Sequence, residues 1–188
     1  MKKYAKRILI ISLILVALVF LLRGGIYRNL VKYQSIGQRE DYYYKNGYLV
    51  ARILRSPENK DSMNFDDIVD AALKITSKSL QFTTNSCEID PNRLIETLQT
   101  NCVGYSAFYS TACNLLLYKH GLSENWHATS QVGHLFLFGF NIHKSTNNPF
   151  FKDHDFVIIK NKITGELLSV DPTIHDYLEI KTVTLKTE

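Results

Sequence analysis

The stretch Asn101–Gly121, "NCVGYSAFYSTACNLLLYKHG", carries the main fold signal of this chain. From Val103 onward its apolar residues recur on one broad helical face, and Gly121 stands where a left-handed glycine often ends a helix. The pattern predicts a helix over Val103–His120. Cys102 then lies in the first turn or at the N-cap, at the mouth of the helix and outside its apolar face.

The position of Cys102 is chemically informative because the thiolate is the reactive form of cysteine. A helix N-terminus presents unpaired N–H groups and about half a positive charge, and both stabilise a thiolate. Cys113 lies three turns deeper on the apolar side of the same helix, where we expect an ordinary core residue. A small buried residue that merely precedes a helix remains the alternative for Cys102.

The elements around this helix indicate an α+β fold. Helical periodicity and capping residues predict two earlier helices, Asn64–Ser77 and Pro91–Leu98. After Gly121 the residues favour strands, and turn residues separate them. The expected strands are Trp126–Ile142, His154–Lys160 and Glu166–Val170. Helices followed by strands predict helices packed on an antiparallel sheet.

The last two strands form a hairpin that can bring a histidine and an aspartate together. If Lys160 pairs with Gly165, His154 stands opposite Asp171 on one face of the sheet. A carboxylate in that position can hold one imidazole nitrogen while the other faces a nucleophile. A register shift of two residues keeps the two side chains as diagonal neighbours, whereas a shift of one separates them.

The other histidines carry weaker arguments. His134 is the main rival, but a lone histidine on an apolar strand more often has a structural role. His120 suits a helix C-terminus, and no partner is evident for the remaining three, His127, His143 and His175. No C-x2-C, H-E-x-x-H or H-x3-H spacing occurs, so we expect neither a bound metal nor a cofactor.

The amino end carries a membrane signal. In "MKKYAKRILIISLILVALVFLLRGG" four basic side chains precede Ile8–Leu22, where Ser12 is the only polar residue. This run spans about 22 Å as a helix, less than a hydrocarbon core of about 30 Å, but Lys6 and Arg23 can reach the interfaces by snorkelling. We expect an uncleaved signal-anchor over residues 1–23.

A cleaved secretory signal is the alternative for this segment, although Leu21-Leu22-Arg23 lacks a small-x-small cleavage pattern. The basic end should stay in the cytoplasm, which predicts a single-pass membrane protein with an extracytoplasmic body. Residues 24–60 are expected to form a juxtamembrane connector and residues 61–180 the folded domain. Tyr48–Leu54 within the connector reads as a strand or a short helix.

The charge balance argues against nucleic-acid binding. Five of the 22 basic residues flank the apolar run, so the rest of the chain holds 17 basic against 18 acidic residues. A nucleic-acid binder would need a basic stripe, and the body has none in its sequence.

Two runs, "NCVGYSAFYSTACNLLLYKHGL" and "DHDFVIIKNKITGELLSVDPT", resemble the transglutaminase-like superfamily, a branch of the papain-like thiol enzymes. The likeness covers roughly Asn64–Ile174. It implies a papain-like core with Cys102 as nucleophile, His154 as general base and acid, and Asp171 as orienting carboxylate. Two features depart from the family pattern: an acid follows the histidine in His154-Asp155-Phe156, where many members have His-Ala-Trp, and a polar segment, Lys144–Lys152, precedes the histidine.

The expected activity is acyl transfer on a peptide or amide of a protein substrate. The Cys102 N–H and a side chain, with Gln99 and Asn101 as candidates, would hold the oxyanion. Hydrolysis, as by a peptidase or amidase, is favoured over cross-linking, because cross-linking requires that water be excluded. Two other functions stay open: an inactive transglutaminase-like module that binds peptide or cell-wall material, and an interaction protein that acts through Ile26–Asn59.

Overall fold

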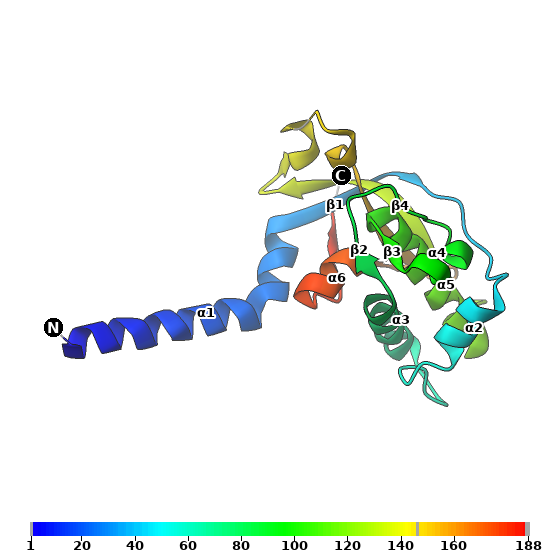
Figure 1. Cartoon of the computed structure of the whole chain (residues 1–188), viewed down its shortest axis with the longest axis horizontal. Helices are drawn as coiled ribbons and strands as arrows, with labels where there is room; N and C mark the ends of the chain where they lie inside the picture. The colour runs from blue at the N-terminus through cyan, green and yellow to red at the C-terminus, as the bar shows by residue number, and fades with distance from the viewer. Residues whose placement is uncertain (1, 146, 187–188) are drawn as a thin grey trace.

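In the computed structural model, which describes residues 2–145 and 147–186, a long amino-terminal helix projects from a mixed α/β body (Figure 1). A sheet packs against helices in this body, and its strands β4 (Trp126–Leu137) and β6 (His154–Asn161) both contact the central helix α5 (Cys102–Lys119). The expectation of an N-terminal apolar helix and of helices packed on a sheet is therefore confirmed.

The amino-terminal helix α1 (Lys2–Leu30) is long and apolar enough to cross a membrane. The most apolar 18-residue window within Lys6–Leu30 has a mean hydropathy of 2.6 and is not buried against the body. The helix continues beyond the expected end at Arg23, whose guanidinium donates a hydrogen bond to the carbonyl of Leu178 at 2.6 Å. The same side chain forms an ion pair with Glu179 at 2.6 Å, so the carboxyl-terminal part of α1 is bonded to the body.

The central helix α5 begins at Cys102, one residue before the expected start. Asn101 is its N-cap, and the Asn101 Oδ1 accepts a hydrogen bond from the Val103 N–H at 3.0 Å. Most of α5 is buried, because α3 (Phe65–Ser79) packs on one side and the sheet on another. The helix therefore carries apolar or small side chains on nearly every face.

The main sheet has the strand order β7-β6-β4-β1-β8, and all neighbours are antiparallel except the short pair β1–β8. The strands are β1 (Val31–Gln38), β4 (Trp126–Leu137), β6 (His154–Asn161), β7 (Leu167–Val170) and β8 (Thr184–Leu185). The expected strand Trp126–Ile142 is divided: a turn at Phe138-Gly139 returns the chain as β5 (Phe140–Asn141), which pairs with β4.

Residues 24–60, expected to form a juxtamembrane connector, contribute elements that pack within the folded body. They supply β1, which lies between β4 and β8, and α2 (Gly47–Leu54), whose Leu49 and Ile53 are fully buried. The expected domain, residues 61–180, also omits β8. Strand β1 belongs to the body because it pairs with β4 and β8, which both lie far from it in the sequence.

The remaining elements are short. They are β2 (Gln81–Phe82), α4 (Pro91–Thr97), β3 (Gln99–Thr100), η1 (Ile142–Ser145), η2 (Pro149–Phe151) and α6 (Pro172–Leu178). Of the expected polar segment Lys144–Lys152, Thr146 lies outside the described residues. Helix α6 was not expected, although Asp171-Pro172 starts it in the same way as Asp90-Pro91 starts α4.

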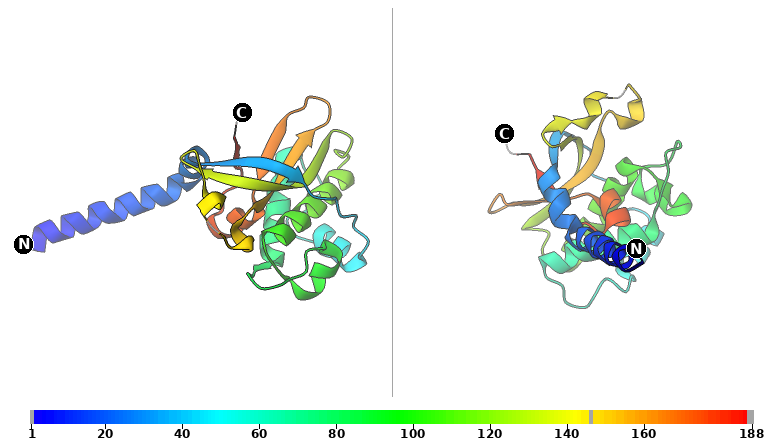
Figure 2. Two further views of the ribbon diagram at one scale, coloured as in Figure 1. Left: turned by 90° about the horizontal axis from the view of Figure 1, so that it is seen from above. Right: turned by 90° about the vertical axis from the view of Figure 1, so that its left-hand side faces the viewer.

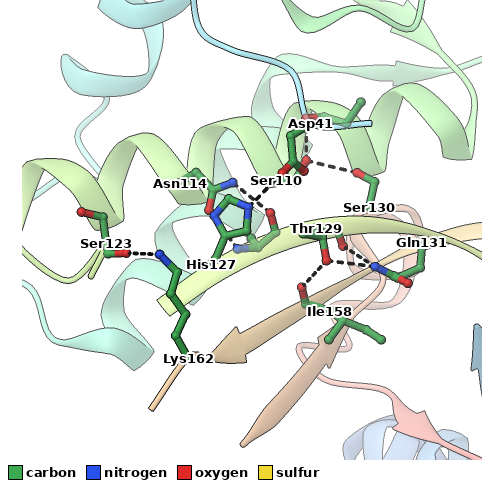
Figure 3. A network of polar contacts seen from close by, with 12 residues as sticks. Asp41, Ser110, Asn114, Ser123, His127, Thr129, Ser130, Gln131, Ile158 and Lys162 are labelled. Atoms are coloured by element: carbon green, nitrogen blue, oxygen red, sulfur yellow. Dashed lines mark hydrogen bonds and ion pairs between the residues drawn. The ribbon is translucent and has the colours of Figure 1, made fainter. Parts of the chain in front are cut away.

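Polar contacts fix α5 against β4 (Figure 3). The Asn114 side chain donates to the Ala128 carbonyl at 2.8 Å and accepts from the Ala128 N–H at 2.9 Å. The hydroxyl groups of Ser110 and Ser130 are 3.1 Å apart. The bidentate amide contact sets the helix along the strand, and so helps to set where the amino end of α5 meets the sheet.

Candidate active site

Cys102 is the first residue of α5, and β3 passes very close to this end of the helix. A Cβ atom built on Gly104 would lie 1.9 Å from Thr100 Oγ1, so only glycine lets β3 pass this near the helix. The Thr100 hydroxyl is held in turn by a hydrogen bond to the Glu88 carbonyl at 2.8 Å. Cys102 is half-buried at this end of the helix, and water can reach its surroundings.

His154 begins β6, and its ring bonds the carboxylate of Asp171. The distance from His154 Nε2 to Asp171 Oδ2 is 2.6 Å, with the histidine side chain 16% exposed and the aspartate side chain fully buried. Since Nε2 is engaged, Nδ1 is the ring nitrogen left for another partner. Cys102 lies close enough to this ring to act on the His154 pKa. The structure thus brings Cys102, His154 and Asp171 together, and their catalytic roles stay a prediction.

The hairpin that joins them has a different register from the expected one. Lys160 pairs with Leu167 and not with Gly165, which is a shift of two residues. The turn is longer than expected, because Asn161 Oδ1 accepts hydrogen bonds from two N–H groups within it and Gly165 adopts φ +76°. His154 and Asp171 are therefore diagonal neighbours across the two strands.

Asp171 is the N-cap of α6, and its carboxylate accepts four hydrogen bonds. Oδ1 accepts from the N–H groups of Thr173 at 3.0 Å and Ile174 at 3.1 Å. Oδ2 accepts from His154 and from the hydroxyl of Tyr33 at 2.7 Å. Burial raises the pKa of Asp171, but the charge of His154 and these hydrogen bonds outweigh it, so the net pKa is lowered. The group is held as a carboxylate.

The environment of His154 favours the imidazolium. Burial of the ring lowers its pKa, but the negative charge of Asp171, the hydrogen bond to that carboxylate and the interaction with Cys102 raise it. The net pKa of His154 lies well above its usual value of 6.5. A protonated ring beside a thiol is suited to stabilise the thiolate form.

Tyr33 belongs to the candidate site, although no sequence pattern predicts it there. It is fully buried on β1, and besides its bond to Asp171 its hydroxyl lies 2.6 Å from the hydroxyl of Tyr27 at the end of α1. Burial, with the nearby charge of Asp171, raises the pKa of Tyr33 well above its usual value, so the hydroxyl stays a neutral donor. No local pattern marks this tyrosine, because its role depends on a strand pairing.

Asp155, the acid that departs from the family pattern, forms an ion pair with an arginine. Arg39 holds the fully buried Asp155 carboxylate through two hydrogen bonds, of 2.8 Å and 3.0 Å. The hydrogen bond to Asp155 is the main cause that raises the pKa of Arg39, and Cys102 lies near enough to contribute through its charge. Arg39 therefore compensates the extra acid and adds a positive charge near the thiol.

The two oxyanion candidates occupy different positions. Asn101 uses its Oδ1 to cap α5, which leaves its amide nitrogen as the possible donor. Gln99 is exposed on β3 and lines a cavity of about 510 Å³ with Cys87, Glu88 and neighbouring polar residues. Neither candidate is distinguished by these contacts, and both stay predictions.

The remaining cysteines and histidines lie in other surroundings. All three cysteines are free thiols, and complete burial raises the pKa of Cys113 to about 12. The rival His134 contacts the ring of His143, with centroids 5.6 Å apart. Within residues 2–145 and 147–186, no group of three or more His, Cys, Asp or Glu side chains is arranged to hold a metal ion.

The segment before His154 reaches across to β2. The ring of Phe150 in η2 packs edge-on against Phe82, with centroids 6.4 Å apart, and Phe82 also neighbours Tyr105 on α5. Tyr105 lies one turn after Cys102, so this aromatic cluster flanks the amino end of α5. The expected polar insertion thus contributes an aromatic wall beside the candidate site.

Comparisons with protein-family models, with curated proteins and with solved structures each gave no match for this chain.

Proposed function

We propose that this chain is a membrane-anchored thiol enzyme of the transglutaminase-like kind, with a papain-like core, that transfers acyl groups from peptide or amide substrates. The proposal is supported above all by the bond between His154 Nε2 and Asp171 Oδ2, together with the thiol of Cys102 beside the same ring. A buried carboxylate, an imidazole and a thiol at a helix N-terminus are the parts that such chemistry needs.

In the first step the Cys102 thiolate attacks the carbonyl carbon of the substrate. A bond forms between sulfur and carbon, and the carbonyl π electrons move to oxygen. The N–H of Cys102, which has no partner within its own helix at this first position, is placed to donate to that oxyanion. The side chain of Gln99 or Asn101 would supply the second donor.

In the second step the C–N bond breaks and the amine leaves with a proton from the His154 imidazolium. This leaves a thioester on Cys102 and a neutral ring still oriented by Asp171. His154 then takes a proton from water, the hydroxide adds to the thioester, and the acid is released. The thiolate and the imidazolium are restored together.

Hydrolysis is the proposed outcome because the thiol is half-buried and not sealed from water. An amine acceptor would give cross-linking through the same thioester. Anchorage by α1, with the basic residues before Ile8 on the cytoplasmic side, would place the body outside the inner leaflet.

The activity can be tested with p-nitrophenyl acetate on the full chain in detergent micelles. We expect a burst of nitrophenolate and an acetyl group on Cys102 by mass spectrometry. Cys102→Ser should abolish the burst, and His154→Ala should slow turnover by about 10²–10⁴-fold. Cys87→Ser is the matched control and should behave as the wild type, because Cys87 also is half-buried but lies off the triad.

Addition of n-butylamine distinguishes the two outcomes: acetate as the sole product supports hydrolysis, and butylacetamide supports transfer to amines. Acylation of Cys87 and Cys102 at equal rates, unaffected by His154→Ala, would contradict an enzyme and favour a binding module that keeps the fold.

A further inference from the structure

The turn between β4 and β5 and the residues next to it carry large apolar side chains that remain exposed to solvent. Leu137, Phe138, Phe140 and Ile142 are all exposed, and Phe138 and Phe140 are 68% and 79% exposed. We call these four residues the hairpin tip. Exposed apolar groups that adjoin along the chain in this way are typical of contact surfaces.

The hairpin tip lies beside the end of the amino-terminal helix. The N–H of Phe138 donates a hydrogen bond to the carbonyl of Leu30, the last residue of α1, at 3.0 Å. Figure 2 shows the β4–β5 turn next to the point where α1 joins the body. A membrane crossed by α1 would therefore lie close to the hairpin tip.

The backbone conformation at the tip does not explain why phenylalanine occupies position 138. Both central residues of this two-residue turn have positive φ, +50° at Phe138 and +85° at Gly139. Glycine, asparagine and aspartate suit such positions, whereas phenylalanine has no side-chain reason to adopt them. An exposed aromatic residue whose backbone adopts an unfavourable conformation implies a favourable contact outside the body.

Basic side chains stand at the base of the same hairpin. Lys186 lies over the ring of Phe136, with its Nζ 4.0 Å from the centroid. Lys32 pairs with Phe136 across β1 and β4, and its Nζ bonds the carbonyl of Arg28, whose own side chain projects from the last turns of α1. Cations at the base of the hairpin, beside the end of α1, suit anionic lipid headgroups.

We propose that the hairpin tip inserts into the headgroup region of the bilayer that α1 crosses. The inference rests on the proposed anchorage. The apolar run Ile8–Leu22 is shorter than a typical hydrocarbon core, which draws the body toward the surface. Aromatic and aliphatic side chains with flanking cations are the composition that binds such an interface.

A second membrane contact would fix the body in rotation as well as in height. The anchor alone leaves the body free to turn about the helix axis, whereas α1 and the hairpin tip together define one face toward the lipid. The candidate active site would then be held at a constant orientation above the membrane, where it would meet substrates at the membrane surface.

Tryptophan quenching by brominated lipid tests the inference on the full chain in phosphatidylcholine–phosphatidylglycerol vesicles. The variants are Phe140→Trp, Val16→Trp in the middle of α1, and Ile163→Trp. Ile163 is the matched control, since it is 76% exposed in the turn after β6, at the opposite end of the sheet. The single native Trp126 pairs beside that same turn and gives an unquenched background.

We expect brominated lipid to remove most of the added fluorescence of Phe140→Trp and Val16→Trp and to leave Ile163→Trp unchanged. Quenching of Val16→Trp without Phe140→Trp would overturn the inference while the anchorage stands. Quenching of neither would overturn both. Equal quenching of Phe140→Trp and Ile163→Trp would show general adsorption of the body and would also overturn it.

Discussion

At the scale of single residues, Asp171 is the group on which the candidate site depends. Its fully buried carboxylate is acceptable only because four donors surround it. Two of the donors are N–H groups in the first turn of α6, one is the ring of His154, and one is the hydroxyl of Tyr33. Tyr33 acts through Asp171 and is a positioning residue.

Tyr33→Phe should destabilise the chain by about 1–3 kcal/mol, the usual effect of removing one donor to a buried charged group. The Tyr33 hydrogen bond lowers the pKa of Asp171, so its loss should also make acid unfolding begin at a higher pH. Urea unfolding in micelles across pH 3–7 measures both effects.

Tyr27→Phe is the control for this measurement, because it keeps the bond from Tyr33 to Asp171 and should shift the acid limb less. An acid limb of Tyr33→Phe that coincides with the wild type would contradict a role for Tyr33 in holding the carboxylate.

The ion pair of His154 and Asp171 should make the stability of the fold depend on pH. The folded pKa of His154 is raised, so its contribution to stability is complete below about pH 6.5 and declines as pH rises through the folded value. The folded pKa of Asp171 is lowered, so its contribution is complete above about pH 3.9 and is lost as pH falls through the folded value. The pair therefore stabilises most between these limits.

The melting temperature of wild type minus that of Asp171→Asn should accordingly be largest near pH 5–6 and narrow toward pH 9. Thermal unfolding in micelles at several pH values gives this difference. A difference that is constant over the range would rule out a titrating pair.

At the scale of elements, the amino end of α5 is set by its contact with β3. Gly104→Ala would improve helix propensity by about 1 kcal/mol, but its Cβ would lie 1.9 Å from the buried Thr100 Oγ1. Overpacking of this kind costs about 1–3 kcal/mol, so we expect net destabilisation or a displaced Cys102.

Urea unfolding and the acylation burst at Cys102 measure the two consequences. Gly47→Ala is the control, because Gly47 also lies in a helix and nothing is within 4 Å of its Cβ position. Equal stability of Gly104→Ala and Gly47→Ala, with an unchanged burst, would argue against the close contact.

The elements also show which parts of the fold are local. Caps and apolar periodicity predicted α3, α4 and α5 to within about two residues, because those signals lie inside each helix. The hairpin register was wrong by two residues, since Asn161 draws its turn into a longer loop through its own side chain. Helix α6 carries the same Asp-Pro start signal as α4, but it was not among the expected helices.

At the scale of the whole molecule, local sequence patterns do not show which distant strands pair. His154 and Asp171 are 17 residues apart and could be placed together by one hairpin, whereas Tyr33 and Asp171 are 138 residues apart. Tyr33 and Arg39 reach the site from the chain before α2, because β1 pairs with β4 and Arg39 follows it. The same pairing ties the end of α1 to the site through Tyr27.

The alkylation of Cys102 by iodoacetamide tests the central claim most directly, with the rates at each cysteine followed by mass spectrometry on the full chain at pH 6. The account predicts that Cys102 reacts much faster than Cys87, that Cys113 is protected by burial, and that His154→Ala lowers the Cys102 rate to that of Cys87. Equal rates at Cys102 and Cys87 in the wild type, or a Cys102 rate that His154→Ala leaves unchanged, would contradict it.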